Sequence, residues 1–268
     1  MKIISFNVAG LRAMLKKQDF EDFINEPSGD YDIICLQEIK AEEKQLTLPS
    51  YLDKYQFKYY NSTKGTTQRK GLSGVSIMSK IEPTTVLKCP EFDEEGRILA
   101  LIYEDFILVN IYVPNSQRFE CERYYFRENW NLKFSTYIGE LTNTYKKEVI
   151  ICGDLNVAHL NIDIVDPKKK ENKVPGFFNN ERKAFYDLLV LNNLRDVFRK
   201  LNPTEQKSTY WSNFLKAERS QKNGWGIDYY LATENIFQKI TDCKILMNIK
   251  GSDHCPLLLE LKETQVSL

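Results

Sequence analysis

The sequence has little of what marks fibrous, disordered or membrane-spanning chains. Its 268 residues include 12 glycines and 9 prolines, which excludes a collagen-like chain, and 42% are hydrophobic, which excludes a wholly disordered one. No apolar run approaches the roughly 20 residues that a membrane span needs, and Met1–Leu11 is too short and too early interrupted for a signal peptide. We therefore expect a globular intracellular protein, in the cytoplasm or the nucleus, with no membrane partner.

The sequence also has no excess of charge, with 37 Lys and Arg against 37 Asp and Glu. A zero net charge excludes a protein that attracts nucleic acid over its whole surface, so a polyanion would have to meet a local basic patch. Two such patches, Lys64–Lys70 and Lys168–Lys170, stand in polar stretches typical of loops. A merely solvated run of charges remains the alternative for each.

Cysteine is scarce and follows no recognisable spacing. The 6 cysteines form no CxxC pair and no zinc-ligand pattern, and most lie in hydrophobic runs such as Ile33–Leu36 and Ile150–Cys152. We predict that they are reduced core residues and expect no zinc site.

Short, nearly continuous apolar runs predict β-strands that are covered on both faces. The predicted strands are Lys2–Val8, Asp32–Leu36, Gly74–Met78, Ile98–Tyr103, Phe106–Val113, Val149–Cys152, Ile227–Ala232 and Cys255–Leu261. Apolar residues at spacings of three and four predict helices over Glu120–Tyr145 and over Asn180–Asn192, with Asn180 as the N-cap of the second. In the first helix the apolar stripe consists of Phe126, Trp130, Phe134, Ile138, Leu141 and Tyr145.

The order of these elements favours a layered α/β sandwich with mixed sheets. Ile98–Tyr103 and Phe106–Val113 are separated only by Glu104 and Asp105, which indicates an antiparallel hairpin. No GxGxxG motif follows the first strand, so a Rossmann fold is disfavoured. We find no repeat or linker and predict one domain over residues 1–268.

Polar residues repeatedly stand at the ends of the predicted strands, where a rigid sheet can aim side chains into one cleft. These residues are Asn7, Glu38, Asp154, Asn156, Asp228, Asp253 and His254. The oxygens of Glu38, Asp253 and Asn7 suit Mg²⁺ or Mn²⁺. A strand-end cap or a surface ion pair remains the alternative for Glu38.

His254 and Asp154 are the candidates for proton transfer. Asp253 and Asp228 could orient and charge the His254 imidazole for work on a phosphate, whereas we expect His159 to be structural. Asp154 could position or deprotonate a water while Asn156, two residues on, contacts the developing charge. An Asx turn that caps the strand is the alternative for these two residues.

Together these segments resemble the exonuclease III class of abasic-site endonucleases, within the endonuclease/exonuclease/phosphatase superfamily. The resemblance lies in Phe6–Ala13, Leu36–Lys40, Gly71–Val75, Glu95–Arg97, Tyr112–Asn115, Cys152–His159, Gly224–Trp225, Asp228–Tyr229 and Gly251–Pro256. Each segment alone is weak evidence, but they occur in the family's order along most of the chain.

The resemblance implies a four-layered α/β sandwich, in which two mostly antiparallel or mixed β-sheets pack face to face with helices outside. It implies a Mg²⁺- or Mn²⁺-dependent hydrolase, acting as a monomer on duplex DNA in base excision repair. The enzyme would cleave on the 5′ side of an abasic site, leaving a 3′-hydroxyl and a 5′-deoxyribose phosphate. A 3′-phosphodiesterase or 3′→5′ exonuclease activity could share the site.

The resemblance also implies roles for individual residues. The catalytic residues would be Tyr112, Asp154, Asn156, Asp228 and His254, and the metal site would comprise Asn7, Glu38, Asp154, Asn156, Asp253 and His254. The DNA contacts would be Lys40, Arg97, Asn115 and Lys168 at phosphates, Arg118 inserted beside the lesion, and Tyr210, Trp225 and Ile227 around the flipped-out sugar.

Three positions depart from the family's pattern. Ala9 stands where the family usually has Asp or Asn near the metal, Gly226 replaces a usual Arg, and Leu72 replaces a common Tyr. Two enzymatic alternatives stay open: an end-processing nuclease of the exonuclease III type, and a relative that acts on another phosphoester, such as an inositol phosphatase or a sphingomyelinase, because those families share the strand-end motifs. The three departures motivate an alternative of another class, a catalytically weakened DNA-binding protein.

Overall fold

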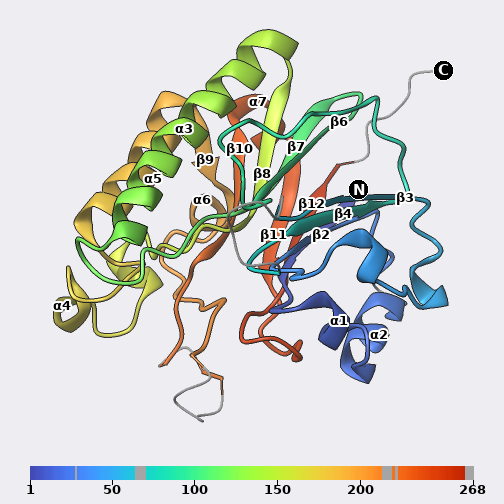
Figure 1. The fold of residues 1–268 in the computed structure, drawn as a ribbon, viewed down its shortest axis with the longest axis horizontal. Coiled ribbons are helices and arrows are strands. Elements are labelled where there is room, and N and C mark those ends of the chain that lie inside the picture. The colour runs from blue at the N-terminus through green and yellow to red at the C-terminus, as the bar shows by residue number, and fades with distance from the viewer. Residues whose placement is uncertain (28, 64–70, 213–218, 221–222, 263–268) are drawn as a thin grey trace.

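Two β-sheets of six strands pack against each other, and helices cover their outer faces (Figure 1). The computed structural model describes residues 1–27, 29–63, 71–212, 219–220 and 223–262. The strands are β1 (Lys2–Asn7), β2 (Ile33–Gln37), β3 (Phe57–Asn61), β4 (Val75–Ser79), β5 (Thr85–Val86), β6 (Ile98–Ile102), β7 (Phe106–Tyr112), β8 (Glu148–Asp154), β9 (Leu194–Asp196), β10 (Asp228–Thr233), β11 (Ile240–Ile245) and β12 (Leu257–Leu261). The α-helices are α1 (Leu11–Met14), α2 (Gln18–Asn25), α3 (Glu122–Tyr145), α4 (Pro167–Lys170), α5 (Asn179–Leu191), α6 (Val197–Leu201) and α7 (Glu234–Phe237), with 3₁₀ turns at Glu43–Gln45, Ser50–Leu52 and Asn161–Asp163.

Each sheet contains one parallel pair of strands within an otherwise antiparallel arrangement. The strand orders are β11-β12-β1-β2-β4-β3 and β5-β6-β7-β8-β10-β9, in which β1 pairs in parallel with β2 and β7 in parallel with β8. The carboxyl ends of two parallel neighbours lie at the same edge of their sheet. The residues that follow β1 and β2, and those that follow β7 and β8, are thereby brought together in pairs.

Three apolar clusters hold the layers together. One lies between the sheets and includes Ile33 and Leu108, a second joins the outer face of the second sheet to α3 and α5, and a third joins the first sheet to α1 and α2. Full burial of a large apolar side chain such as Phe134 stabilises the fold by about 1.5–3 kcal/mol. This succession of helices, sheet, sheet and helices confirms the predicted four-layered sandwich.

A polar network crosses the apolar interface between the sheets. Gln37, at the end of β2, donates through Nε2 to Oδ1 of Asn110 in β7 at 2.7 Å, and both side chains are fully buried. Asn110 in turn donates to the main-chain oxygens of Leu36 and Ser76 at 3.0 and 2.8 Å. A buried polar group needs such partners, so the network fixes how the two sheets sit against each other beside Glu38.

Each predicted strand overlaps an observed one, and both predicted helices form, with two corrections to their details. In α3 the buried stripe contains Arg127 rather than Phe126, and Tyr145 is 39% exposed. The predicted N-cap at Asn180 is wrong, because α5 begins at Asn179 and the Glu181 carboxylate accepts the Phe178 N–H at 3.0 Å.

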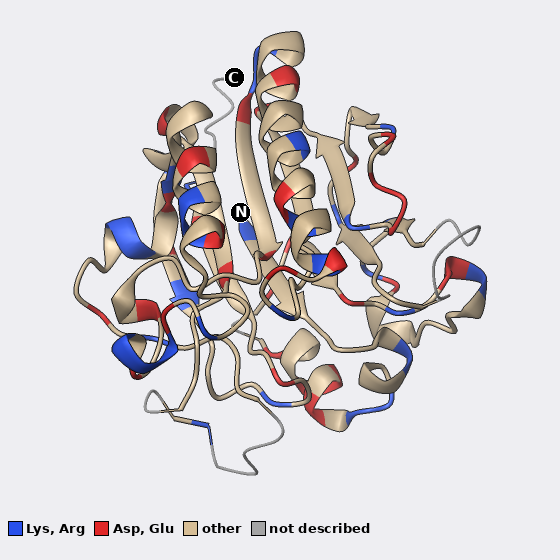
Figure 2. Cartoon of the chain, turned by 60° about the vertical axis from the view of Figure 1, so that its left-hand side comes forward, with Lys and Arg blue, Asp and Glu red and all other residues tan. Residues whose placement is uncertain are grey.

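Only one of the two predicted basic patches lies within the described residues. Lys168–Lys170 lies in the short helix α4 rather than in a loop, because Pro167 supplies a helical φ at the first position. Lys64–Lys70 lies outside the described residues. Elsewhere Figure 2 shows Lys and Arg interspersed with Asp and Glu along the helices, in keeping with the zero net charge.

All six cysteines are thiols that form no disulfide. Cys35, Cys152, Cys243 and Cys255 are buried, whereas Cys89 and Cys121 are partly exposed and are not core residues. Within the described part of the chain, no helix combines the length and the apolar composition that a membrane crossing requires.

Candidate active site

A cavity of about 390 Å³ opens at the edge where β2, β7 and β8 end. Most of the predicted catalytic and DNA-contacting residues line it. The lining consists of Glu38, Tyr112, Asn115, Asp154, Asn156, Val174, Pro175, Gly176, Tyr210, Ser212, Trp225, Ile227, Asp253 and His254. Of the strand-end residues singled out in the sequence, the cavity brings together Glu38, Asp154, Asn156, Asp253 and His254, whereas Asn7 and Asp228 are not part of its lining.

Gly153 allows Asp154 to reach the cavity. Its φ is +139°, and a Cβ added there would lie 1.9 Å from the carbonyl oxygen of Ile111 in β7. Only glycine permits this close approach of β7 and β8. Two residues on, Asn156 has a φ of +51° and donates its main-chain N–H to Oδ1 of Asp154 at 2.8 Å. The Asx-type turn that the sequence left as an alternative is therefore present.

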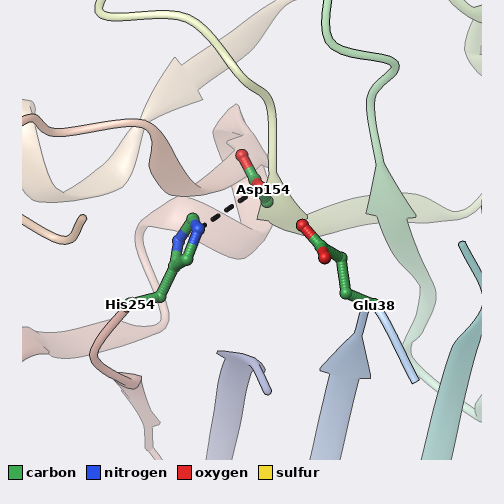
Figure 3. A group of neighbouring side chains, drawn as sticks. All are labelled: Glu38, Asp154 and His254. Atoms are coloured by element: carbon green, nitrogen blue, oxygen red, sulfur yellow. Dashed lines mark ion pairs between the residues drawn. The ribbon is translucent and has the colours of Figure 1, made fainter. Parts of the chain in front are cut away.

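Glu38, Asp154 and His254 point toward one another from three separate segments (Figure 3). One ligand atom from each lies within 4.8 Å of the others, and His254 Nε2 is 3.8 Å from Asp154 Oδ2. Their side chains are 15%, 2% and 4% exposed, so the group is nearly withdrawn from solvent. Carboxylate oxygens at such separations fit a hard divalent cation. Asp253 lines the cavity but lies outside this group.

Asn7 links the two carboxylates. Its Nδ2 donates to Glu38 Oε1 at 3.1 Å and to Asp154 Oδ2 at 2.9 Å, while its Oδ1 accepts the Ala9 N–H at 3.0 Å. These hydrogen bonds position Glu38 and Asp154, and a role of the Asn7 oxygen at a metal stays a prediction.

The charges of the group are set by burial and by its neighbours. Burial and the adjacent Asp228 carboxylate raise the pKa of Asp154 to about 8. Burial opposes the positive form of His254, but Asp228, Asp154 and Asp253 outweigh it and raise the His254 pKa to about 10. Burial of Glu38 is likewise outweighed, chiefly by Lys40, so the pKa of Glu38 is lowered. At neutral pH Glu38 is an anion and His254 a cation.

Asp228 orients the His254 ring. Its Oδ2 lies 2.8 Å from His254 Nδ1, and residues 228 and 154 are partners on β10 and β8. With Nδ1 committed to Asp228 and a raised pKa, Nε2 of His254 carries a proton toward the cavity. In this protonated form His254 is a hydrogen-bond donor toward the cavity, while its ring also belongs to the group of side chains that could hold a metal ion.

Tyr112 ends β7 beside Glu38. Burial, followed by the Glu38 charge, raises its pKa well above the usual range, so the phenol keeps its proton and remains a hydrogen-bond donor. Arg97 stacks on this ring with its guanidinium carbon 4.5 Å from the centroid. Because the Arg97 side chain is 3% exposed and pairs with Glu95 at 2.5 Å, it does not fit its predicted role as a phosphate contact.

Asn156 and Asn115 form a second pair of amides at the rim. Asn156 Nδ2 donates to the Val113 oxygen at 2.8 Å, and its Oδ1 accepts from Asn115 Nδ2 at 3.2 Å. Both polar ends of the Asn156 side chain thus have a partner in the protein, and its predicted place in the metal site stays a prediction. Asn115 is exposed beside it and remains available to a phosphate.

The remaining predicted DNA contacts lie around the opening. Lys40 is 40% exposed and Arg118 is exposed in the segment between β7 and α3, whereas Lys168 is exposed on α4, away from the cavity lining. Lys170, which sequence reasoning did not single out, places its Nζ 5.1 Å from the centre of the Trp225 ring. A basic residue in the same run therefore lies closer to the cavity wall than the predicted one.

One wall of the cavity is apolar. Tyr210, Trp225 and Ile227 line it, as predicted, and pack on a small cluster that includes Phe177. The Tyr210 ring also lies 4.9 Å from the His254 ring. The hydrophobic wall thus directly adjoins the charged group.

A buried ion pair supports the loops that carry both amides, and sequence reasoning missed it. Arg127 of α3 donates to the main-chain oxygens of Leu155 (3.0 Å) and Asn156 (2.8 Å) and lies 3.1 Å from Glu181 of α5. Glu181 also accepts from Ser116 at 2.6 Å, next to Asn115. An arginine among apolar residues at helical spacing was the signal available in the sequence.

The three departures from the expected pattern add no charged group to the cavity. Ala9, with a φ of +50°, contributes only its N–H to Asn7. Gly226 donates its N–H to the Asp163 oxygen at 2.7 Å, and Leu72 is partly buried. His159, expected from the sequence to be structural, packs its ring 4.6 Å from that of Phe185 and is not part of the cavity lining.

Comparisons with known proteins cover nearly the whole chain. A model of the endonuclease/exonuclease/phosphatase family matches residues 4–254, which include every residue of the cavity lining. The chain is 39% identical over 262 residues to an exodeoxyribonuclease of Bacillus subtilis (strain 168), spanning 97% of this chain and 98% of that protein. It is 38% identical over 266 residues to the DNA repair nuclease APEX1 of Danio rerio, spanning 97% and 82%. An AP endonuclease structure from Archaeoglobus fulgidus matches with a TM-score of 0.84 at 27% identity, over 98% of this chain and 100% of that one.

Proposed function

The chain belongs to the endonuclease/exonuclease/phosphatase family, and from that premise we propose that it is a divalent-metal-dependent DNA-repair nuclease. Its substrate is duplex DNA with an abasic site, which it cleaves on the 5′ side to leave a 3′-hydroxyl and a 5′-deoxyribose phosphate. The observation that carries the proposal is the cavity itself. It joins Glu38, Asp154 and a charged His254 to an apolar wall within about 390 Å³.

Different residues of the cavity would bind the metal ion, accept a proton from the attacking water and donate hydrogen bonds to the phosphate. Glu38, with Asp154 beside it, would hold Mg²⁺ or Mn²⁺, and the bound ion would supply positive charge to offset the charge of the phosphate and of the leaving oxygen. Asp154 accepts the proton of the attacking water, since a pKa of about 8 lies near neutral pH, as a general base requires. His254 and Tyr112 donate hydrogen bonds to the phosphate oxygens on which negative charge develops.

The apolar wall provides the selection for damaged DNA. Tyr210, Trp225 and Ile227 would receive a deoxyribose that has lost its base and been turned out of the duplex. Asn115, Arg118 and Lys40 at the rim would contact the backbone, which positions DNA without reading its sequence. The same cavity can process 3′ ends, in agreement with the similarity to an exodeoxyribonuclease. We propose that the chain acts as a single catalytic domain and as a monomer.

The decisive test is cleavage of a labelled duplex with one stable abasic analogue, compared with an undamaged duplex and a recessed 3′ end, in Mg²⁺, Mn²⁺ or chelator. We expect one incision 5′ to the lesion that chelator abolishes. Asp154→Asn should slow it by about 10²–10⁴-fold, while Glu42→Gln, a surface change four residues from Glu38, should leave it intact.

Other outcomes would redirect the assignment. Degradation mainly from the recessed end would make the protein an end-processing nuclease. Turnover of a phosphomonoester without any DNA cleavage would indicate another phosphoesterase of the family. Binding to the lesion without cleavage in either metal would leave a DNA-binding protein.

A further inference from the structure

Glu38 has a positively charged partner in addition to its neighbours in the cavity. Lys40 Nζ lies 2.6 Å from Glu38 Oε2, and Asn7 Nδ2 donates to the other oxygen, Oε1, at 3.1 Å. Both oxygens of this carboxylate therefore already have a donor. The Lys40 side chain is 40% exposed and the Glu38 side chain 15%, so the pair lies at the mouth of the cavity, with the lysine on the solvent side.

Glu38 supplies one of the two carboxylates in the group that could hold a cation. The other, Asp154, accepts the Asn156 N–H through Oδ1 at 2.8 Å and the Asn7 amide through Oδ2 at 2.9 Å. On the Asn7 side, Ala9 has only a methyl group, and its N–H is used by Asn7 Oδ1. No carboxylate from that segment can compensate when Glu38 is occupied.

We propose that Lys40 competes with the metal ion for Glu38, and that a DNA phosphate relieves the competition by drawing the Lys40 ammonium away. The second half rests on the proposed function, while the first does not. A lysine carries a compact charge on a flexible stem, so an exposed one can exchange a carboxylate for a phosphate within its reach. The cation and Lys40 cannot both approach Glu38 Oε2 without strong mutual repulsion.

This arrangement makes metal binding and DNA binding mutually reinforcing. If bound DNA raises the affinity for the cation, the cation must raise the affinity for DNA by the same factor. The free enzyme would bind the metal ion weakly, and the enzyme bound to DNA would bind it tightly. Lys40 is a positioning residue in this scheme, since it acts through Glu38.

The same loop offers a matched control. Lys44 Nζ pairs with Glu42 Oε2 at 2.7 Å, with side chains 79% and 32% exposed, and neither residue lines the cavity. Lys44→Met removes the same charge, four residues further along, without freeing an oxygen of Glu38.

The first experiment measures Mn²⁺ binding without DNA, from the electron paramagnetic resonance signal of free Mn²⁺. We expect Lys40→Met to bind Mn²⁺ about five- to tenfold more tightly than the wild type, the effect of removing a partly exposed ion pair. Lys40→Arg should stay near the wild type and Lys44→Met within about twofold of it. Thermal unfolding confirms that each variant is folded. Equal or weaker binding by Lys40→Met, or equal tightening by Lys44→Met, would overturn the competition.

The second experiment adds an undamaged duplex, with binding followed by the anisotropy of a label on the DNA. Glu38→Gln with the same duplex gives the Mn²⁺ that DNA binds by itself. The wild type should gain Mn²⁺ affinity on the duplex, and Lys40→Met should gain less, because its Glu38 is already free. If the bound duplex leaves the Mn²⁺ affinity of the wild type unchanged, the second half of the proposal, relief of the competition by DNA, is overturned. A duplex that does not bind would contradict the proposed function and with it the second half, while the DNA-free comparison still decides the first.

Discussion

Replacement of Arg127 by methionine should weaken both the fold and the chemistry. The guanidinium is 2% exposed, pairs with a Glu181 side chain that is 1% exposed, and donates to the main-chain oxygens of Leu155 and Asn156. In Arg127→Met the Glu181 carboxylate stays buried without its cation, which costs about 3–5 kcal/mol. Native proteins are stable by about 5–15 kcal/mol, so the loss is a large share of the total.

Urea denaturation of three variants isolates the cause. The double variant Arg127→Met, Glu181→Gln should recover part of the loss, because no charge is left buried without a partner. Arg195→Met is the matched control. Arg195 pairs with Glu234 at 2.7 Å, but these side chains are 43% and 47% exposed, so its removal should cost about 0–1 kcal/mol.

Kinetic measurements on the abasic duplex test whether the buried pair of Arg127 and Glu181 positions Asn156. Where Arg127→Met is still folded, kcat should fall by about tenfold to a hundredfold, because Asn156 loses the contact that fixes its backbone. The KM for DNA should change little, since Arg127 does not reach the surface. Stability equal to the wild type would refute the energetic reasoning, and an unchanged kcat in a destabilised variant would refute the positioning.

Two further changes test the fold beneath the site. Burial lowers the pKa of His159 from 6.5 to about 4, so its neutral form stabilises the fold above pH 6.5 and this contribution is lost as the pH falls toward 4. In urea denaturation, the decline in unfolding free energy between pH 7 and pH 4.5 should be about 1–2 kcal/mol smaller in His159→Phe than in the wild type, and an equal decline would contradict the assignment. Gly153→Ala should cost about 3 kcal/mol or more, because its Cβ would meet the Ile111 oxygen, whereas Gly10→Ala, with a φ of +120° and nothing within 4 Å, should cost about 1 kcal/mol. Equal costs for the two alanines would show that the close approach of β7 and β8 is not what requires glycine.

Continuous apolar runs predicted the strands that lie between two layers, but not the strands that the structure leaves half covered. β3 is only partly buried along most of its length, and in β11 only Ile240 and Cys243 are buried. Neither produces a run of apolar residues that stands out from a loop. β5 and β9, with two and three residues, are too short for any periodicity to register. A continuous apolar run reveals a strand only where both faces of the strand are covered and apolar side chains are therefore required on each.

The candidate site shows the same limit at the level of single atoms. That Glu38 and Asp154 would meet was predictable, because each directly follows a hydrophobic strand. That Asn7 presents its nitrogen was not, because it depends on the Ala9 N–H folding back to the amide oxygen. Arg97 was placed on DNA by resemblance, yet Glu95 and Tyr112 enclose it, and a motif carries no measure of burial.

The two parallel strand pairs explain why the reactive groups meet where they do. β1 and β2 end at Asn7 and just before Glu38, and β7 and β8 end at Tyr112 and Asp154. Because the sheets pack face to face, the four ends meet at one rigid edge, where carboxylates are held together despite their repulsion. That repulsion, added to burial, keeps the pKa of Asp154 near 8 until a cation offsets it. The residues around the opening belong instead to segments outside the strands. They can therefore be substituted without disturbing the strand-end residues at the base of the cavity. Family members can therefore share the chemistry of this edge and still differ in the phosphoester that they admit.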